Sequence, residues 1–225
     1  MISYLKKIKK EELFIGIVAS IVGYILAKKF IFKKDKNETN NEKNNNENNK
    51  LFRLPDPGVE LRAMPNDDEL TSRFKTIAGS DYDSYIESIK QIPLEPIIAI
   101  RQLYNESAFS PAVINCSRVS SAGARGIAQF MPKTWPAYSN GDPCNVPDSL
   151  KAHAKMMKDL IKKFPNRPDL ALAGYNSGPY IQFPSGDSRG KYKYDWAFNN
   201  NIPFKDLKGL IPNESYKYSS SILRP

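Results

Sequence analysis

The pattern of apolar and polar positions divides the chain into three parts. Residues 13–27 carry no charge and are mostly apolar, and residues 30–32 extend this run beyond two lysines. Residues 35–50 are dominated by Asn, Glu and Lys, with almost no side chain to bury. In the remainder, helical patterns dominate. We therefore predict a membrane anchor with basic flanks over 1–34, a linker over 35–66 and one folded domain over 67–225.

The first part has the length of a membrane-spanning helix. Residues 13–32 would span about 30 Å, enough for a bilayer core if Lys28 and Lys29 extend toward the headgroups. A cleaved signal peptide is the alternative, but the uncharged run is long for one, and two lysines directly follow Ala27 in place of a small-residue cleavage pattern. Lysines flank the run on both sides, so the positive-inside rule gives no orientation. We predict an uncleaved single-pass anchor that contacts lipid through residues 13–32.

The second part has the composition of a tether. A stretch so rich in Asn, Glu and Lys cannot bury enough apolar surface to fold, and we predict that it is disordered. Pro55, Pro57 and Pro65 keep the following residues extended. A flexible segment of about 30 residues has a root-mean-square reach of roughly 30 Å. The folded domain would therefore search the space near its anchor.

Local signals predict three helices in the folded domain. One begins at Pro96, which suits the first helical turn, and carries Glu106 in its last turn, ahead of Pro111. A second begins at Pro168 and ends at Gly178. The third has one apolar face with spacings of four and three, formed by Leu150, Ala154, Met157, Ile161 and Phe164. We also predict a tight turn leading into a helix at Gly123, Ala124 and Gly126.

Four ordered motifs point to a chemical function. Glu106-Ser107 ends the first helix, and residues 120–134 read Ser-Ser-Ala-Gly-Ala-Arg-Gly-Ile-Ala-Gln-Phe-Met-Pro-Lys-Thr. Residues 171–178 read Ala-Leu-Ala-Gly-Tyr-Asn-Ser-Gly, and residues 211–218 read Ile-Pro-Asn-Glu-Ser-Tyr-Lys-Tyr. Over roughly residues 80–224, the chain resembles the soluble lytic transglycosylases, which are related to goose lysozyme.

The resemblance implies a mainly α, lysozyme-like domain with a cleft between two lobes. It implies that Glu106 is the catalytic acid. The sequence itself shows no phosphate-binding glycine loop and no metal-ligand set around its one histidine, so we expect neither a cofactor nor a metal. The resemblance also implies substrate contacts from Ser120, Gln129, Met131, Tyr175, Asn176, Glu214 and Tyr218. Tyr175 could instead position or neutralise Glu106. The chain departs from the family's pattern at Ser215, Tyr216 and Ser219, and it carries about five extra residues, including Cys116, before Ser120.

The implied chemistry needs a single carboxylate. The acid protonates the glycosidic oxygen, the N-acetyl group of the sugar supports the oxocarbenium-like state, and the resulting carboxylate takes a proton from the C6 hydroxyl. The product would be a 1,6-anhydro sugar. Such an acid must be protonated near neutral pH, which a partly dry and apolar site favours.

Two other functions remain open at this stage. A hydrolytic muramidase of the same fold would need a positioned water and a second carboxylate, for which Asp142, Asp148 and Glu214 are candidates. A wall-binding or structural membrane protein would keep the fold without turnover. The apolar run and the resemblance together favour a membrane-anchored enzyme that opens peptidoglycan locally for a secretion machine or an infecting phage. Its catalytic domain would lie outside the cytoplasm, or its anchor would lie in the membrane of a virus particle.

Charge, cysteines and the single histidine refine this picture. The net charge is +9, but the lysines are dispersed and gather chiefly beside the apolar run, so we expect lipid and anionic wall polymers as partners, and no nucleic acid. Cys116 and Cys144 could form a disulfide on an oxidising side of the membrane or remain two free thiols. We expect His153 at the surface or its boundary, because no ligand set surrounds it. Residues 191–196 alternate cations and aromatics, as a sugar-binding rim, a surface loop or a partly buried aromatic cluster would.

Overall fold

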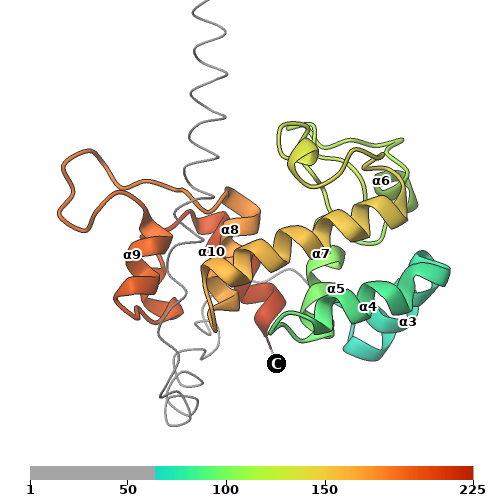
Figure 1. The fold of residues 1–225 in the computed structure, drawn as a ribbon, viewed down its shortest axis with the longest axis horizontal. Helices are drawn as coiled ribbons and strands as arrows, with labels where there is room; N and C mark the ends of the chain where they lie inside the picture. The colour runs from blue at the N-terminus through green and yellow to red at the C-terminus, as the bar shows by residue number, and fades with distance from the viewer. Residues whose placement is uncertain (1–63, 225) are drawn as a thin grey trace, which may run out of the picture. The chain divides into compact units, whose positions relative to one another are not determined.

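The structure, a computed structural model, describes residues 64–224 and is mainly helical (Figure 1). The described residues contain no β-strand, but isolated β-bridges join Arg125 to Phe130 and Gln182 to Tyr192. The α-helices are α3 (Asp67–Ala78), α4 (Tyr82–Lys90), α5 (Pro96–Ser107), α6 (Pro111–Ile114), α7 (Val146–Lys163), α8 (Pro168–Ser177), α9 (Lys193–Asn199) and α10 (Asn213–Leu223). Three short 3-10 helices are η1 (Gly79–Asp81), η2 (Trp135–Ala137) and η3 (Phe204–Leu207). The mainly α fold predicted from the sequence is confirmed.

The predicted anchor, residues 13–32, lies outside the described residues, as does nearly all of the predicted linker, 35–66. Within residues 64–224, the helices are either too short or too polar to cross a bilayer.

Helix α7 is the longest helix described, and it crosses the domain (Figure 1). Asn145 caps its first turn by accepting a hydrogen bond from the amide of Asp148 at 3.1 Å. Its predicted apolar stripe is confirmed, because Leu150, Ala154, Met157, Ile161 and Phe164 are all buried. Helices α3 and α4 pack near its amino-terminal part, and α8 packs against it as well.

Helices α5 and α10 bring two distant parts of the chain together. The guanidinium of Arg101 on α5 forms two hydrogen bonds with the carboxylate of Asp67 on α3, at 2.8 and 2.7 Å. It also donates to the carbonyl of Ile222 on α10 at 3.2 Å. A bidentate guanidinium–carboxylate pair fixes orientation as well as distance. Arg101 therefore holds α10 against α5, the helix that carries Glu106.

The ends of α5 and α8 follow their predicted signals. Pro96 occupies the first turn of α5, and the helix ends at Ser107 because Ala108 and Phe109 adopt left-handed conformations with φ of 51° and 53°. The hydroxyl of Ser107 accepts a hydrogen bond from the amide of Phe109 at 3.1 Å, which satisfies a donor beyond the helix end. Helix α8 begins at Pro168 and ends before Gly178, whose φ is 81°.

Two predictions from the sequence are wrong, one about the turn at Gly123 and Gly126 and one about His153. The turn at Gly123 and Gly126 does not lead into a helix: Arg125 and Phe130 exchange two backbone hydrogen bonds, at 3.1 and 3.0 Å, and close a hairpin-like loop. His153 is fully buried, and its Nδ1 is 2.9 Å from the Tyr85 hydroxyl. Burial lowers the pKa of His153 to about 3, because the charged ring would lose its hydration. The ring is therefore a neutral core side chain.

Buried apolar residues form two clusters. The larger includes residues of α3, α4, α5 and α7 together with Ile127 and Phe130. The smaller surrounds Phe164, Tyr194 and Tyr216, where Tyr216 stacks on Phe204 with ring centroids 4.9 Å apart. Glu106 lies at the end of a helix whose buried face belongs to the larger cluster.

Candidate active site

Glu106 is the carboxylate at the centre of the predicted site. It lies half-buried in the last turn of α5, where Tyr218 on α10 donates a hydrogen bond to its Oε1 at 2.5 Å. Burial raises the pKa of the Tyr218 phenol well above its ordinary value, and the nearby Glu106 raises it further. Tyr218 therefore remains a protonated donor at neutral pH and fixes the orientation of the carboxyl group.

A pocket of about 210 Å³ opens beside Glu106. Besides Glu106, its lining consists of Ala124, Gln129, Phe130, Met131, Thr134, Met156, Tyr175 and Asn176. Glu106 is the one carboxylate among these described residues. The site thus combines a single acid with apolar walls and a few amide and hydroxyl groups, as expected for a partly desolvated proton donor.

The loop over residues 120–130, here called the cleft loop, forms one wall of this pocket, and Gly126 determines its path. Gly126 has φ of 74°, and a Cβ atom on it would lie 1.8 Å from the carbonyl oxygen of Pro143. Only glycine fits such a conformation and such a close approach. Gln129 is also left-handed, with φ of 49°, and its Nε2 donates to the carbonyl of Gly126 at 2.8 Å. The turn therefore holds Gln129 at the edge of the pocket.

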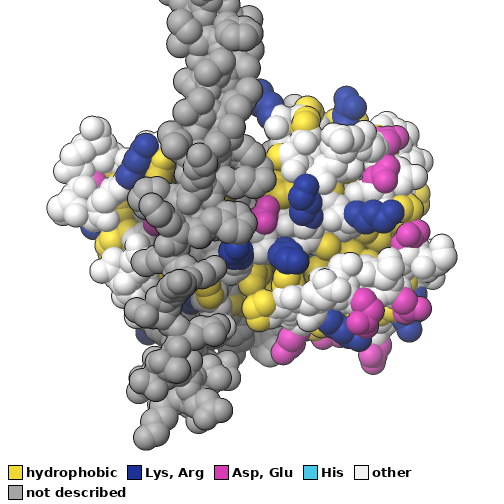
Figure 2. Space-filling view, in the orientation of Figure 1, with side chains coloured by type: hydrophobic (Ala, Val, Ile, Leu, Met, Phe, Trp, Pro, Cys, Tyr) yellow, Lys and Arg dark blue, Asp and Glu magenta, His cyan; other side chains and the backbone are white. Residues whose placement is uncertain are grey.

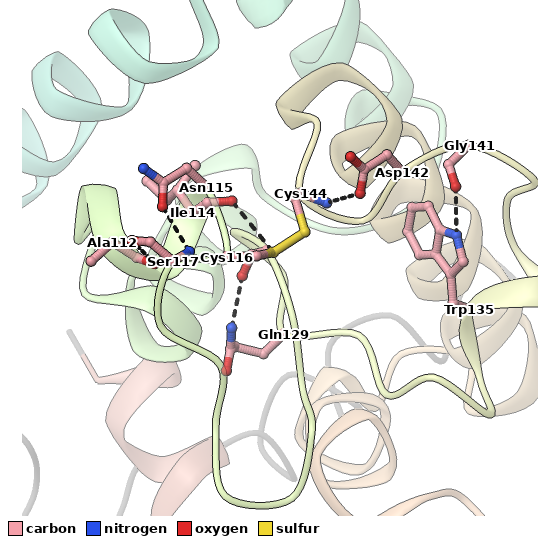
Figure 3. The surroundings of a disulfide bond; sticks show 11 residues. Ala112, Ile114, Asn115, Cys116, Ser117, Gln129, Trp135, Gly141, Asp142 and Cys144 are labelled. Atoms are coloured by element: carbon pink, nitrogen blue, oxygen red, sulfur yellow. Dashed lines mark hydrogen bonds between the residues drawn. A yellow bond between two sulfur atoms is a disulfide. The ribbon is translucent and has the colours of Figure 1, made fainter.

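A disulfide between Cys116 and Cys144 closes the stretch of chain that contains the cleft loop (Figure 3). It joins the segment after α6 to the segment before α7, with Cα atoms 5.6 Å apart. Cys144 follows Pro143, the residue against which Gly126 packs. Asp142 supports this segment by accepting a hydrogen bond from the Cys144 amide at 2.9 Å (Figure 3). The wall of the pocket is thus attached to a covalently closed part of the chain.

Helix α8 supplies another part of the lining through Tyr175 and Asn176. Tyr175 donates a hydrogen bond to the carbonyl of Ala128 at 2.7 Å, so it connects α8 to the cleft loop. Burial of this phenol raises its pKa well above the ordinary value, and the proximity of Glu106 adds to the effect. Asn176 accepts a hydrogen bond from Ser215 on α10 at 2.8 Å. Tyr175 and Asn176 thereby connect α8 to the cleft loop and to α10, and both residues also line the pocket.

A comparison with protein families identifies the family to which the chain belongs. Residues 83–195, half of the chain, match the family model for the transglycosylase SLT domain. The chain belongs to this family. Its members are lytic transglycosylases that act on peptidoglycan, and this protein is therefore an enzyme of the lytic transglycosylase type. No solved structure matches the chain significantly.

The SLT match includes α5, the cleft loop, α7 and α8, but it ends before α10. The tyrosine that holds Glu106 therefore comes from outside the matched residues. Glu214 and Tyr218 line a second pocket of about 390 Å³ beside the first, together with Asn105, Asn176, Asn213, Lys217 and Ser221. Asn176 lines both pockets, so they are neighbouring parts of one candidate substrate cleft.

The structure does not bring Ser120 into the lining of either pocket. Its hydroxyl accepts a hydrogen bond from the amide of Ala124 at 2.8 Å, so it stabilises the start of the cleft loop. Met131 does line the first pocket and is 39 % exposed, as an apolar wall accessible to a substrate requires.

The departures from the family's closing motif have structural explanations. Ser215 binds Asn176, and Ser219 donates to the carbonyl of Asp169 on α8 at 3.0 Å. Tyr216 is fully buried on Phe204. These side chains attach α10 to its surroundings, so the departures leave the position of Tyr218 beside Glu106 intact.

Sequence reasoning missed Phe130, Thr134 and Met156 as pocket residues. Thr134 stands at the end of the second motif, but nothing distinguished its side chain from a turn residue. Met156 lies next to Met157 of the buried stripe. Successive side chains of a helix are rotated by about 100°, so Met156 lies outside that stripe, and the stripe did not identify it. Within residues 64–224, no three His, Cys, Asp or Glu residues lie together as a metal site would require.

Proposed function

We propose that this SLT enzyme cleaves the β-1,4 bond between MurNAc and GlcNAc and forms 1,6-anhydroMurNAc, with Glu106 as its single acid and base. The observation that carries this proposal is the lining of the catalytic pocket, in which Glu106 is the one carboxylate among the described residues. Its hydrogen bond from Tyr218 holds one carboxyl oxygen in place. The acidic proton would then reside on the other oxygen.

The reaction consists of two proton transfers, which together return Glu106 to its protonated starting state. In the first, Glu106 gives its proton to the glycosidic oxygen as the C1–O bond breaks, and the leaving sugar receives a hydroxyl. The N-acetyl group of MurNAc supports the developing positive charge at C1. In the second, the Glu106 carboxylate removes the C6 hydroxyl proton while that oxygen bonds to C1. No water is consumed.

The positions of the other carboxylates favour this scheme over hydrolysis. Asp148 accepts a hydrogen bond from the amide of Asp142 at 3.1 Å, and Asp142 accepts one from Cys144, so both serve the loop before α7. Glu214 lines the neighbouring pocket and not the one beside Glu106. A hydrolase would need a second carboxylate placed to activate water or attack the sugar.

Mass spectrometry of digested peptidoglycan tests the proposal directly. The expected products end in 1,6-anhydroMurNAc. Reducing ends would identify a hydrolytic muramidase of the same fold, and the absence of cleavage by folded protein would identify a wall-binding or structural protein.

Replacement of Glu214 with Gln should leave measurable activity and the same anhydro product. Glu214 lies beside Tyr218 in the second pocket, where it could hold substrate, and loss of such a hydrogen bond costs about 1–3 kcal/mol. Turnover and product ends of the purified variant measure this. If the folded variant is as inactive as Glu106→Gln, a two-carboxylate mechanism becomes the better account.

We further propose that residues 13–32 anchor the enzyme in a membrane and that residues 35–66 tether the catalytic domain to it. The uncharged run and the polar composition of the following segment support this arrangement. Peptidoglycan lies outside the cytoplasm, so the catalytic domain would lie there too, or the anchor would lie in the membrane of a virus particle. The enzyme would open the wall locally for phage entry or for a secretion system.

The charge on the catalytic domain suits an anionic wall. Figure 2 shows Lys and Arg side chains over α7, where Lys151, Lys155, Lys158 and Lys162 are exposed. Wall polymers that carry carboxylates would be attracted to this face, although salt weakens such attraction.

The full-length protein should require detergent for extraction from membranes, whereas a chain that starts at residue 66 should be soluble and still cleave peptidoglycan. The reason is that the anchor would be removed while every described helix is retained. Fractionation followed by a wall-digestion assay checks both parts. A native mature chain shortened near residue 27 would instead indicate a cleaved signal peptide.

A further inference from the structure

Tyr180 is an exposed aromatic residue just beyond α8, the helix that carries Tyr175 and Asn176. Its side chain is 53 % exposed, the largest fraction among the exposed large hydrophobic residues of the described chain. The Nζ atom of Lys163 lies 4.9 Å from the centre of its ring and covers one face. Tyr192 contacts the ring edge-on, with centroids 5.4 Å apart. Lys163 and Tyr192 therefore hold the ring of Tyr180 in place, while about half of the residue remains exposed.

The loop that carries Tyr180 has a defined backbone at its base. It runs between α8 and α9 and projects from the helices in Figure 1. Phe183 and Lys193 each donate a backbone hydrogen bond across it, to Lys191 at 3.0 Å and to Ile181 at 2.8 Å. Phe183 packs edge-on against Trp196, with centroids 5.7 Å apart, and anchors the loop on α9. The backbone around Tyr180 and Tyr192 is thus held by hydrogen bonds and by the packing of Phe183 on α9.

Helix α7 connects this aromatic pair to the catalytic pocket. Met156 on α7 lines the pocket beside Glu106, and Lys163 follows seven positions later. Seven positions are almost two helical turns, so the two side chains share a face of α7 and are separated by about 10 Å along its axis. Lys163 is held there by Asp195, with Nζ and Oδ1 2.8 Å apart. The face of α7 that lines the catalytic pocket therefore leads to the cation that supports Tyr180.

We propose that Tyr180, braced by Tyr192 and Lys163, is a platform on which a sugar ring of the same glycan strand stacks, outside the catalytic pocket. This inference rests on the proposed function and adds a further subsite to it. A sugar ring presents C–H groups on its faces, which pack on an aromatic face, and hydroxyls at its edge, which a phenol can hydrogen-bond. Because the substrate is a continuous polymer, a strand whose scissile bond lies at Glu106 extends beyond the pocket. The platform would hold that extension.

The charged side chains around the platform are consistent with a neutral sugar ring as its ligand. Lys163 is already paired with Asp195, and the cation near Tyr192 is Lys191, 5.1 Å from the ring centre. Tyr180 is exposed and carries no charge, and an aromatic ring binds a sugar through contact area and not through net charge. Binding at the platform should therefore be less sensitive to salt than attraction to the lysines of α7.

Binding of the full-length protein to purified peptidoglycan tests this proposal. The measurement is made in detergent on the Glu106→Gln background, so that no strand is cut while binding is measured. Tyr180→Ala should raise the dissociation constant about fivefold, equivalent to about 1 kcal/mol, whereas Tyr180→Phe should retain most of the affinity because it keeps the aromatic face. Val119→Ala is the matched control, because Val119 is also exposed, at 40 %, and lies outside both pockets.

A kinetic comparison with Glu106 restored separates binding from chemistry. On long glycan strands, Tyr180→Ala should raise KM and leave kcat unchanged, as expected when binding is lost equally in the ground and transition states. Unchanged affinity in Tyr180→Ala, or an equal loss in Tyr180→Phe, would overturn the proposal. Since binding is measured without turnover, these results do not depend on whether the products carry anhydro ends.

Discussion

Glu106→Gln should reduce the rate of peptidoglycan cleavage by at least about 10²–10⁴, the contribution typical of general acid–base catalysis. The amide has the size of the carboxyl group and can still accept the hydrogen bond from Tyr218, but it has no acidic proton to transfer. The fold should therefore persist while the reaction stops. Release of anhydro-ended fragments from purified peptidoglycan measures the loss, and thermal unfolding checks that the variant is folded.

Glu95→Gln provides the matched control. Glu95 is exposed at the other end of the same helix, and its side chain forms no capping hydrogen bond. The same chemical change there should leave turnover nearly unchanged. Near-normal turnover in Glu106→Gln would refute the assignment of Glu106 as the acid, whatever the control shows.

The parts of the fold that the sequence predicted are those determined by neighbouring residues. Pro96 and Pro168 begin their helices because proline has no amide hydrogen to lose in a first turn, and Gly178 ends α8 with a positive φ. The apolar stripe from Leu150 to Phe164 predicted which face of α7 is buried, because an amphipathic helix places its apolar face in the core. These signals also located Glu106 at the end of α5.

The features that could not be predicted depend on long-range packing. Tyr218 reaches Glu106 across 112 positions of sequence, and no local pattern reveals which tyrosine will do so. The course of the cleft loop depends on how closely Gly126 approaches Pro143, which is a tertiary contact. The surface position expected for His153 is wrong because the helical period turns the ring inward, where it meets Tyr85. The same limitation kept the cysteine pairing open.

Removal of the disulfide by Cys116→Ser together with Cys144→Ser should lower the free energy of unfolding by about 3–4 kcal/mol, since the closed loop spans 28 positions of sequence. For a domain of this size, the melting temperature should fall by roughly 10 °C. The loss should also weaken substrate binding, because the closed loop contains both Gly126 and Pro143 and therefore the wall that carries Gln129 and Met131. Thermal unfolding and KM for glycan strands measure the two effects.

Addition of a thiol reductant distinguishes the disulfide from the serine substitutions themselves. The reductant should lower the melting temperature of the wild-type protein toward that of the double variant and should leave the double variant unchanged. If the oxidised protein and the double variant unfold at the same temperature, the bond contributes nothing to stability. A fall in stability without a rise in KM would mean that the packing of Gly126 against Pro143 holds the cleft wall without the covalent link.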